Sequence, residues 1–439
     1  MQTLLVFSHL RWDFVYQRPQ HLLSRLAKHY RVLFFEEPVR GQTPYLERLQ
    51  PSLNLEVLRP HTTVDAPGFH DDQLSELKPL LAEYLSESSI SDYLVWFYTP
   101  MALPLLADLH PRAVIYDCMD ELSAFRNCPP QMVQRESALM KRAQIVFTGG
   151  PSLFQAKRRR HGNVQCFPSA VDAAHFSQGI KLNGASRGAS SPHVSLPVAA
   201  SKDARRSGWD QEAHRMHASI ARPRLGFFGV IDERFDIELV AAVADRAPGW
   251  QFVFVGPVVK IDPASLPQRA NVHWMGQQSY EMLPHLVAQW DVCLLPFACN
   301  ESTRFISPTK TLEYMAAEKP IVSTPIRDVM DLYSDSVAIA DSADQFLSAC
   351  QAALSESATE RGLRITRMRA HVDQCTWDLT ARRIHAEIEA ELRRKDASVA
   401  AMVVGADRSV APATRSVGAL LGRATDRTVA ESAIPTPAG

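Results

Sequence analysis

The sequence has few of the features that mark metal-binding, redox and membrane proteins. Its seven cysteines form no CxxC pair, which favours reduced thiols in a cytoplasmic protein over a disulfide framework. It has no HExxH, His–Cys cluster or Asp-x-Asp element, so we expect no metal site. No stretch reaches the roughly 18 apolar residues of a membrane span. The opening MQTLLVFSHLRWDF predicts a short strand and not a signal peptide.

A bias in charge is also missing. With 47 Lys and Arg against 48 Asp and Glu, the net charge is -1, which gives no general attraction to nucleic acid. The GxGxxG fingerprint of nicotinamide and flavin enzymes does not occur either. What remains is an ordinary globular composition, 46% apolar and 22% charged, in a chain of 439 residues. That length is enough for two domains.

Short buried strands alternate with amphipathic helices in both halves of the chain. We expect strands over 3–7, 32–35, 93–97, 113–116, 145–148, 225–228, 252–255, 272–274, 292–295 and 321–324. The clearest helices between them are 17–29, 131–142, 237–247, 280–289 and 343–354. This alternation predicts the α/β class, with two Rossmann-like, doubly wound parallel sheets. Ligands of such sheets bind beyond the carboxyl ends of the strands.

The pattern divides the chain into five segments. A first α/β domain covers 1–176, and a Ser-, Ala-, Gly- and Arg-rich insert, predicted to be flexible, covers 177–221. A second α/β domain covers 222–360, and helices follow over 361–395. The last segment, 396–439, lacks apolar periodicity and is predicted to be disordered.

The stretch from Asp291 to Pro325 reads as strand, polar loop, helix and strand. Serine is a favoured N-cap and proline a favoured first helical residue, so we expect the helix to start in the turn made by Ser307, Pro308, Thr309 and Lys310. A helix N-terminus attracts phosphate, and Lys310 adds a full positive charge. Glu313 lies one turn further on and can accept hydrogen bonds from a ribose diol. The alternative is an ordinary capped helix with a surface Lys–Glu pair.

The segment PTKTLEYMAAEKPIVST resembles the donor-binding element of GT-B glycosyltransferases. The resemblance is to the large retaining "group 1" type, glycosyltransferase family 4, of bacterial polysaccharide and cell-wall biosynthesis. It implies two domains facing a cleft, in which the Ser307–Lys310 turn holds the diphosphate of a nucleotide sugar and Glu313 holds its ribose. Two positions depart from the family. Phe305 stands where many relatives have a glutamate, with Glu301 out of register, and Glu318 stands where a glycine is usual.

The resemblance also implies a reaction and its partners. A hexosyl group would move from a nucleotide-diphosphate sugar to a glycan or lipid-linked acceptor, without a metal and with no cofactor besides that co-substrate. The 361–395 helices would cross back onto the first domain. One alternative is a nucleotide-sugar epimerase of the same fold. The other is a non-catalytic nucleotide-sugar-binding partner, which Phe305 in place of the family's glutamate would allow.

Further candidate residues follow other predicted strands. On the donor side, Gly229 and Gly256 let backbone approach a ligand, and Arg234 would join Lys310 on the leaving diphosphate. On the acceptor side we expect a set of polar side chains, with His9 and Asp120 as catalytic candidates: His9, Arg11, Asp117 and Asp120. Asp120 could serve as a general base, although Asp also favours ordinary turns.

A basic helix around Leu153-Phe154 carries Lys157, Arg158, Arg159 and Arg160. Such a face can rest on anionic lipid, which would place a cytoplasmic enzyme peripherally on the inner face of the cell membrane. A solvated basic face is the alternative explanation.

Overall fold

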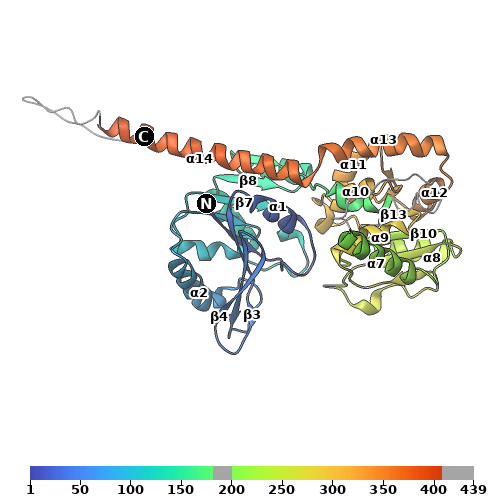
Figure 1. The fold of residues 1–439 in the computed structure, drawn as a ribbon, viewed down its shortest axis with the longest axis horizontal. Coiled ribbons are helices and arrows are strands. Elements are labelled where there is room, and N and C mark those ends of the chain that lie inside the picture. Colours follow the sequence, from blue (N-terminus) through green and yellow to red (C-terminus); the bar gives the residue numbers. More distant parts are fainter. Residues whose placement is uncertain (181–199, 408–439) are drawn as a thin grey trace, which may run out of the picture. The chain divides into compact units, whose positions relative to one another are not determined.

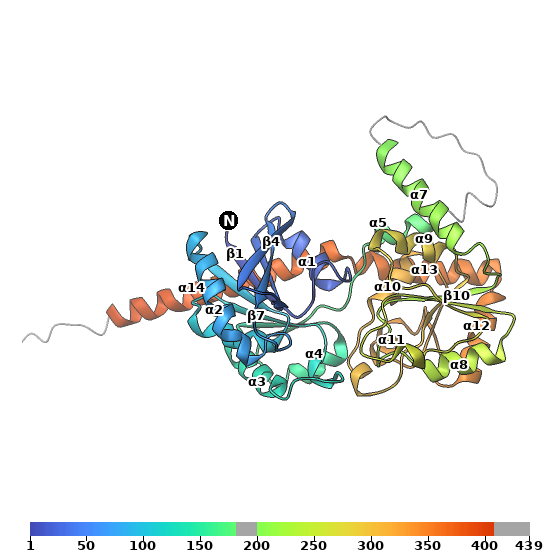
Figure 2. The ribbon, with the colours of Figure 1, turned by 90° about the horizontal axis from the view of Figure 1, so that it is seen from below.

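The computed structural model of the protein describes residues 1–180 and 200–407. Met1–Leu392 form one compact unit, and the chain from Arg393 onward is counted as a second. The first unit contains two separate sheets with helices packed against them (Figure 1, Figure 2). The predicted α/β class with two parallel sheets is confirmed.

The first sheet has nine strands in the described residues, in the order β3-β5-β2-β1-β6-β7-β8-β9, with β4 paired to β5. Its strands are β1 (Thr3–Ser8), β2 (Arg31–Glu36), β3 (Val39–Arg40), β4 (Tyr45–Ser52), β5 (Leu55–Thr62), β6 (Tyr93–Phe97), β7 (Val114–Cys118), β8 (Ile145–Thr148) and β9 (Val164–Cys166). All six residues of β1 are buried because parallel neighbours and helices enclose a central strand on both faces.

Helices cover both faces of this sheet. Those between its strands are α1 (Arg18–Leu26), η1 (Asp71–Gln73), α2 (Leu74–Glu87), η2 (Pro100–Asp108), η3 (Leu122–Ala124), α3 (Met132–Arg142) and α4 (Pro151–Lys157). On one face, α1 packs together with Trp377, Ile384 and Ile388 of α14 (Trp377–Asp407). On the other face, α2 and α3 bury their leucines against the opposite side of the same strands. The helix that ends the first unit therefore crosses back to the first sheet.

The second sheet is parallel throughout, in the order β12-β11-β10-β13-β14-β15. Its strands are β10 (Arg224–Phe228), β11 (Gln251–Val255), β12 (Val272–Trp274), β13 (Val292–Leu295), β14 (Ile321–Ser323) and β15 (Ala338–Ile339). The helices of this half are α5 (Ala173–Phe176), α7 (Ala200–Met216), α8 (Ile237–Arg246), η4 (Pro263–Ser265), η5 (Tyr280–Met282), α9 (Leu283–Ala288), η6 (Glu301–Thr303), α10 (Thr309–Ala316), α11 (Arg327–Tyr333), α12 (Ala343–Leu354) and α13 (Ala358–Gln374). Together they enclose one large apolar core.

Two segments predicted to lack structure contain helix. In the insert predicted over 177–221, α7 is anchored because Ala213 and His217 are buried and His217 accepts a hydrogen bond from Trp290 Nε1 (3.2 Å). In the tail predicted from 396, α14 continues to Asp407, and the alanines at 397, 400, 401 and 406 favour helix there. Residues 181–199 and 408–439 lie outside the described residues.

The first sheet also has a hairpin that the strand–helix alternation did not predict. β4 pairs antiparallel with β5, and Asn54 turns between them at φ 61°. Asparagine tolerates this left-handed conformation better than most residues, which makes it a suitable turn residue here. The hairpin places β5 and Arg59 beside the end of β2.

Candidate active site

One cavity of about 740 Å³ lies at the carboxyl ends of both sheets. From the first sheet it is lined by the loop after β1 (Trp12–Gln17), by Met119 and Asp120 after β7, and by Gly149 after β8. From the second sheet, the turns after β10, β11, β12 and β13 and the start of α10 contribute. Its size suits a small-molecule ligand, and its place is the one expected for a doubly wound fold.

The start of α10 forms the best-defined wall of this cavity. The helix begins at Thr309, with Pro308 in the N-cap position and no side-chain cap, so the prediction of Ser307 as the cap was wrong. Proline has no N–H, and its ring fixes an extended entry to the helix. Ser307 instead accepts a hydrogen bond at its carbonyl from Ser169 Oγ (2.8 Å). The first N–H groups of α10 are therefore left without a side-chain acceptor beside the cavity.

Lys310 lies in this first turn and lines the cavity. Across residues 1–180 and 200–407 its ammonium group makes no hydrogen bond or ion pair, and it lies 5.8 Å from the centre of the Phe227 ring. Burial lowers the pKa of Lys310, while Glu313 opposes that shift. A half-buried ammonium group without a close partner in the described part of the chain is unfavourable by itself, so an anion in the cavity would stabilise it.

Glu313 lies one turn further along α10 and is only 6% exposed. Its Oε2 atom is buried and has no hydrogen-bond partner among the described residues. Burial raises the pKa of Glu313 to about 7, although the nearby Lys310 lowers it. An unsatisfied buried carboxylate oxygen is costly, which makes Glu313 a natural acceptor for hydroxyl groups of a ligand.

Gly229 and Gly256 end β10 and β11 with positive φ angles of 145° and 148°. A Cβ atom on Gly229 would lie 2.0 Å from Lys310 Cε, and one on Gly256 would lie 1.9 Å from the Gly229 carbonyl oxygen. The glycines were expected to admit a ligand. In the structure they first allow these two turns to pack against each other and leave room for Lys310.

Arg234 lines the cavity, as expected, but it is not a free cation. Its guanidinium donates to both oxygens of buried Asp232, with Nε–Oδ1 at 2.9 Å and Nη2–Oδ2 at 2.7 Å. Burial lowers the pKa of Arg234, but these bonds to Asp232 raise it overall. The pair is therefore nearly neutral, and Lys310 provides the less compensated positive charge.

The two aspartates predicted on the acceptor side occupy different environments. Asp120 lines the cavity, and burial raises its pKa, opposed by Arg234 and Arg18. Asp117 is fully buried and accepts two hydrogen bonds from Arg18, at 3.0 and 2.9 Å. Its expected acceptor contact is wrong in this structure, because both carboxylate oxygens already hold the arginine that begins α1.

His9 and Arg11 are not among the residues that line the cavity. Burial lowers the pKa of His9 to about 4, with Lys260 adding to the effect, so its imidazole is neutral at pH 7. Arg11 instead donates to Glu36 (3.2 Å) and to the carbonyls of Glu37 and Pro38. The expectation that Arg11 faces the acceptor is therefore not met, since its guanidinium is used within the first sheet.

Sequence reasoning missed the aromatic part of the cavity. The rings of Tyr16 and Tyr280 stack with their centres 4.5 Å apart, and Gln277 Nε2 donates to the Phe14 carbonyl (2.6 Å). These contacts join the loop after β1 to the turn after β12. The aromatic residues at positions 12, 14 and 16 were the available signal. A loop has no regular repeat, however, so their spacing did not show which way their side chains point.

The two departures from the family pattern have distinct surroundings. Phe305 packs against the apolar core of the first sheet, while the Glu301 side chain is 79% exposed and does not line the cavity. Glu318 has φ 57°, a left-handed conformation that favours glycine, and its carboxylate accepts a hydrogen bond from Arg369 Nε (2.7 Å). The left-handed backbone conformation at this position therefore explains why glycine is usual there in the family.

The basic helix does not present the free cationic face that was considered. Lys157 is 1% exposed and pairs with Glu121 (2.7 Å) and Glu136. Arg160 also pairs with Glu136 (2.6 Å), which leaves Arg158 and Arg159 as its exposed cations. Among the described residues, none of the helices combines the length and apolar character required to cross a membrane. Nor do these residues contain a His, Cys, Asp and Glu cluster suited to a metal ion.

Part of the chain is similar to a known protein family. Residues 222–356 match the model of the family described as "Glycosyl transferases group 1". The chain is 24% identical over 293 residues to TuaH of Bacillus subtilis (strain 168), whose name assigns it to teichuronic acid biosynthesis as a glycosyltransferase. That match covers 65% of this chain and 70% of TuaH.

Solved structures share the fold. Sucrose-phosphate synthase from Thermosynechococcus elongatus has a TM-score of 0.65 at 15% identity, covering 89% of this chain and 99% of that one. Anabaena Alr3699/HepE, solved in complex with UDP and glucose, has a TM-score of 0.58 at 14% identity, covering 89% and 100%. The family match, the relative and the fold agree with the cavity described above: residues 222–356 are similar to the group 1 glycosyltransferases, and the chain has the GT-B fold.

Proposed function

We propose that the protein transfers a hexosyl group from a nucleotide-diphosphate sugar to a glycan or lipid-linked acceptor in cell-envelope polysaccharide biosynthesis. The observation that carries this proposal is the start of α10. There, a helix terminus without a side-chain cap, the Lys310 ammonium and the Glu313 Oε2 share a wall of one cavity, and neither side-chain group has a hydrogen-bond or ion-pair partner within residues 1–180 and 200–407. The teichuronic acid assignment of TuaH supports an envelope polysaccharide as the product class.

Each part of a nucleotide sugar has a matching group on this wall. The diphosphate would lie at the N-terminus of α10, where Thr309 and Lys310 supply N–H groups and charge. The ribose diol would donate to Glu313. The turns at Gly229 and Gly256 would enclose the phosphates from the opposite side. The sugar would then face the first sheet, whose loops hold Asp120 and the aromatic residues.

The chemical step of this proposal is displacement of the nucleoside diphosphate by an acceptor hydroxyl group. Negative charge develops on the departing diphosphate, and Lys310, with the Arg234 guanidinium behind it, stabilises that charge. Asp120 is our candidate to receive the acceptor proton, because it lines the cavity and because burial raises its pKa, which makes its carboxylate a stronger base. These side chains supply the positive charge themselves, so we expect full turnover in the presence of EDTA.

A thermal-shift screen followed by a transfer assay tests the proposal. UDP or GDP should raise the melting temperature, because a ligand present at 100 times its Kd stabilises the folded state by about 2.7 kcal/mol. Nucleoside diphosphate release from the matching sugar donor should require an acceptor. Absence of a shift with any nucleoside diphosphate at millimolar concentration would overturn the donor site. Conversion of the donor sugar without acceptor would indicate an epimerase instead.

A lipid-linked acceptor would bring the protein to a membrane surface, and we propose a peripheral contact of this kind. Arg158 and Arg159 are the exposed cations available on α4 and the turn after it. Co-sedimentation with vesicles containing anionic lipid should fall for the double substitution of these arginines by glutamine. Unchanged sedimentation would place any membrane contact elsewhere.

A further inference from the structure

Glu36 is a fully buried carboxylate outside the cavity, at the end of β2. In the sheet register it pairs with Ser8, the last residue of β1, so it lies beside the start of the loop that lines the cavity. Removing a carboxylate from water is unfavourable unless several donors compensate it. The donors that satisfy Glu36 therefore show which part of the structure it holds.

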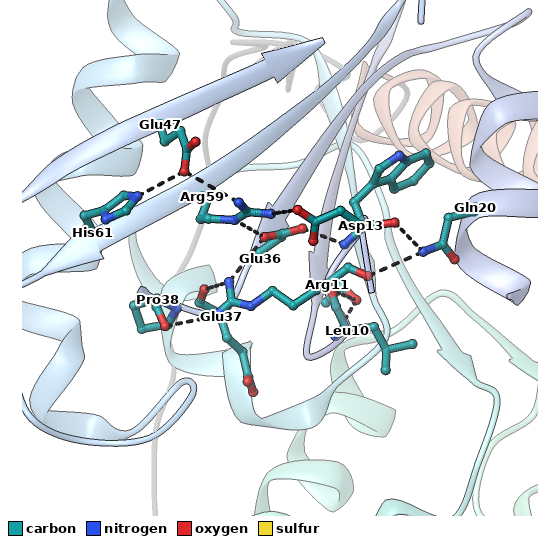
Figure 3. Close-up of polar contacts among 12 residues, drawn as sticks. Leu10, Arg11, Asp13, Gln20, Glu36, Glu37, Pro38, Glu47, Arg59 and His61 are labelled. Atoms are coloured by element: carbon teal, nitrogen blue, oxygen red, sulfur yellow. Dashed lines mark hydrogen bonds and ion pairs between the residues drawn. The ribbon is translucent and has the colours of Figure 1, made fainter. Parts of the chain in front are cut away.

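Two of the three groups that donate to Glu36 belong to the loop after β1, and the third, Arg59, also binds that loop (Figure 3). Oε1 accepts from the Trp12 backbone N–H (2.6 Å), and Oε2 accepts from Arg11 Nη1 (3.2 Å) and Arg59 Nε (2.7 Å). Arg59 in turn donates through Nη2 to Asp13 Oδ2 (3.0 Å). One buried carboxylate thus fixes three consecutive loop residues, 11, 12 and 13.

The far end of the same loop is held by Gln20, a fully buried side chain in the first turn of α1. Its Nε2 donates to the carbonyls of Trp12 (2.8 Å) and Val15 (3.0 Å), and its Oε1 accepts from Gln17 N–H (3.0 Å). Within the described ranges the loop has no strand partners, so side chains satisfy backbone groups that a sheet would otherwise pair. Between these two fixed points, residues 12–17 form the first-sheet wall of the cavity.

We propose that Glu36 is a positioning residue for glycosyl transfer, holding the loop Leu10–Gln17 in the shape that forms the acceptor-side wall. The inference rests on the proposed function, since the wall faces the sugar only if the donor lies on α10. Glu36 itself would touch neither substrate. A charge-assisted network of this kind gives geometric precision, because the guanidinium of Arg59 reaches a carboxylate on each side in one fixed orientation.

Glu47 provides a matched control. It lies on β4, pairs with the same Arg59 (3.7 Å) and with His61 (3.0 Å), and makes no hydrogen bond or ion pair with a loop residue in the described part of the chain. Glu36→Gln and Glu47→Gln therefore remove the same charge from the same cluster. Only Glu36→Gln replaces a carboxylate that accepts hydrogen bonds from Trp12, Arg11 and Arg59 by an amide group. Arg59→Lys serves as a milder second variant, since it keeps the charge but cannot bridge Glu36 and Asp13.

The experiment is hydrogen–deuterium exchange with and without UDP, followed by steady-state kinetics with UDP-glucose as the donor probe and a saturating acceptor from the transfer assay above. In Glu36→Gln, amides of residues 9–18 should exchange roughly ten- to a hundredfold faster, which corresponds to the loss of a charge-assisted hydrogen bond. Arg59→Lys should show a smaller increase, and Glu47→Gln should match the parent. Protection of residues 306–316 by UDP should be equal in all four proteins. With UDP-glucose, kcat should fall at least about fivefold while KM stays within about twofold, a division that general destabilisation would not produce.

The outcomes separate this inference from the proposed function. If UDP protects no segment of the parent, the donor site fails, while exchange in residues 9–18 still decides the role of Glu36. If Glu36→Gln and Glu47→Gln exchange alike in that segment, Glu36 does not hold the loop and the inference is overturned. The same conclusion follows if Glu36→Gln raises KM for UDP-glucose and loses UDP protection as well, since the defect would then extend to the second sheet. Should Glu36→Gln fail to fold, Arg59→Lys decides by the same criteria.

Discussion

Replacing Glu313 by glutamine should make the ligand-free protein more stable and its nucleotide binding weaker. The pKa of Glu313 is about 7 in the folded state against an ordinary value of 4.5, because of burial. At about 1.4 kcal/mol per tenfold change in proton affinity, this corresponds to about 3 kcal/mol. The raised pKa means that the folded state holds its proton more tightly than the unfolded chain does. The stability due to this group is therefore fully present below pH 4.5 and is lost as pH rises to 7.

Glutamine has no proton to lose, so the variant lacks this decline. The melting temperature of Glu313→Gln relative to the parent should increase by several degrees between pH 5 and pH 7.5, measured without nucleotide. In the same pH range its affinity for UDP should be lower than that of the parent. Glu318→Gln, at the end of the same helix and away from the cavity, is the control and should show neither effect. A difference between variant and parent that stays constant with pH would refute the assignment of a buried carboxylate with a raised pKa at this position.

Three further substitutions test other parts of the account. Lys310→Ala should weaken UDP binding at least about tenfold but leave uridine binding nearly unchanged, since in the proposed site only the phosphates would face this ammonium. Titrations with both ligands check it, with Lys78→Ala on α2 as the control. Gly229→Ala should reduce UDP affinity and lower stability by about 1–3 kcal/mol. Its φ of 145° is unfavourable for alanine, and the new methyl group would meet Lys310. Equal melting curves of variant and parent would contradict this. Trp377→Ala should cost about 3–5 kcal/mol in denaturant unfolding, because this buried ring fixes α14 to the first sheet, and a loss below 1 kcal/mol would show that the contact is dispensable.

The sequence predicted well those features that depend on local chemistry. The strand, helix and strand around Lys310 could be predicted because apolar runs, a proline and a breaking Lys-Pro follow each other within one segment. Lys310, Glu313, Arg234, Gly229 and Gly256 all line the same cavity, as their positions after strands implied. Only the cap was misassigned, because a Ser-Pro pair allows the helix to start at either side of the proline.

Features that depend on a partner distant in the sequence could not be predicted. Asp117 follows a strand, as a catalytic carboxylate could, but Arg18 lies 99 residues away and binds both of its oxygens. Lys157 belongs to a basic run, but Glu121 and Glu136 bury its charge. The helix α7 lies in a low-complexity stretch and is anchored by contact with Trp290, which no local pattern reveals. In each case tertiary pairing determined the environment of the side chain.

In the site that we propose, α10 binds the nucleoside diphosphate of a sugar donor, with Glu313 on the ribose diol. Calorimetric titration of UDP into the parent and into Glu313→Ala tests it most directly, with 2′,3′-dideoxy-UDP as the matched ligand. Loss of charge-assisted bonds worth about 1.5–3 kcal/mol should weaken UDP roughly ten- to over a hundredfold in the variant. The dideoxy nucleotide should bind the parent weakly and lose little more in the variant. A folded Glu313→Ala protein that binds UDP as tightly as the parent would contradict the account.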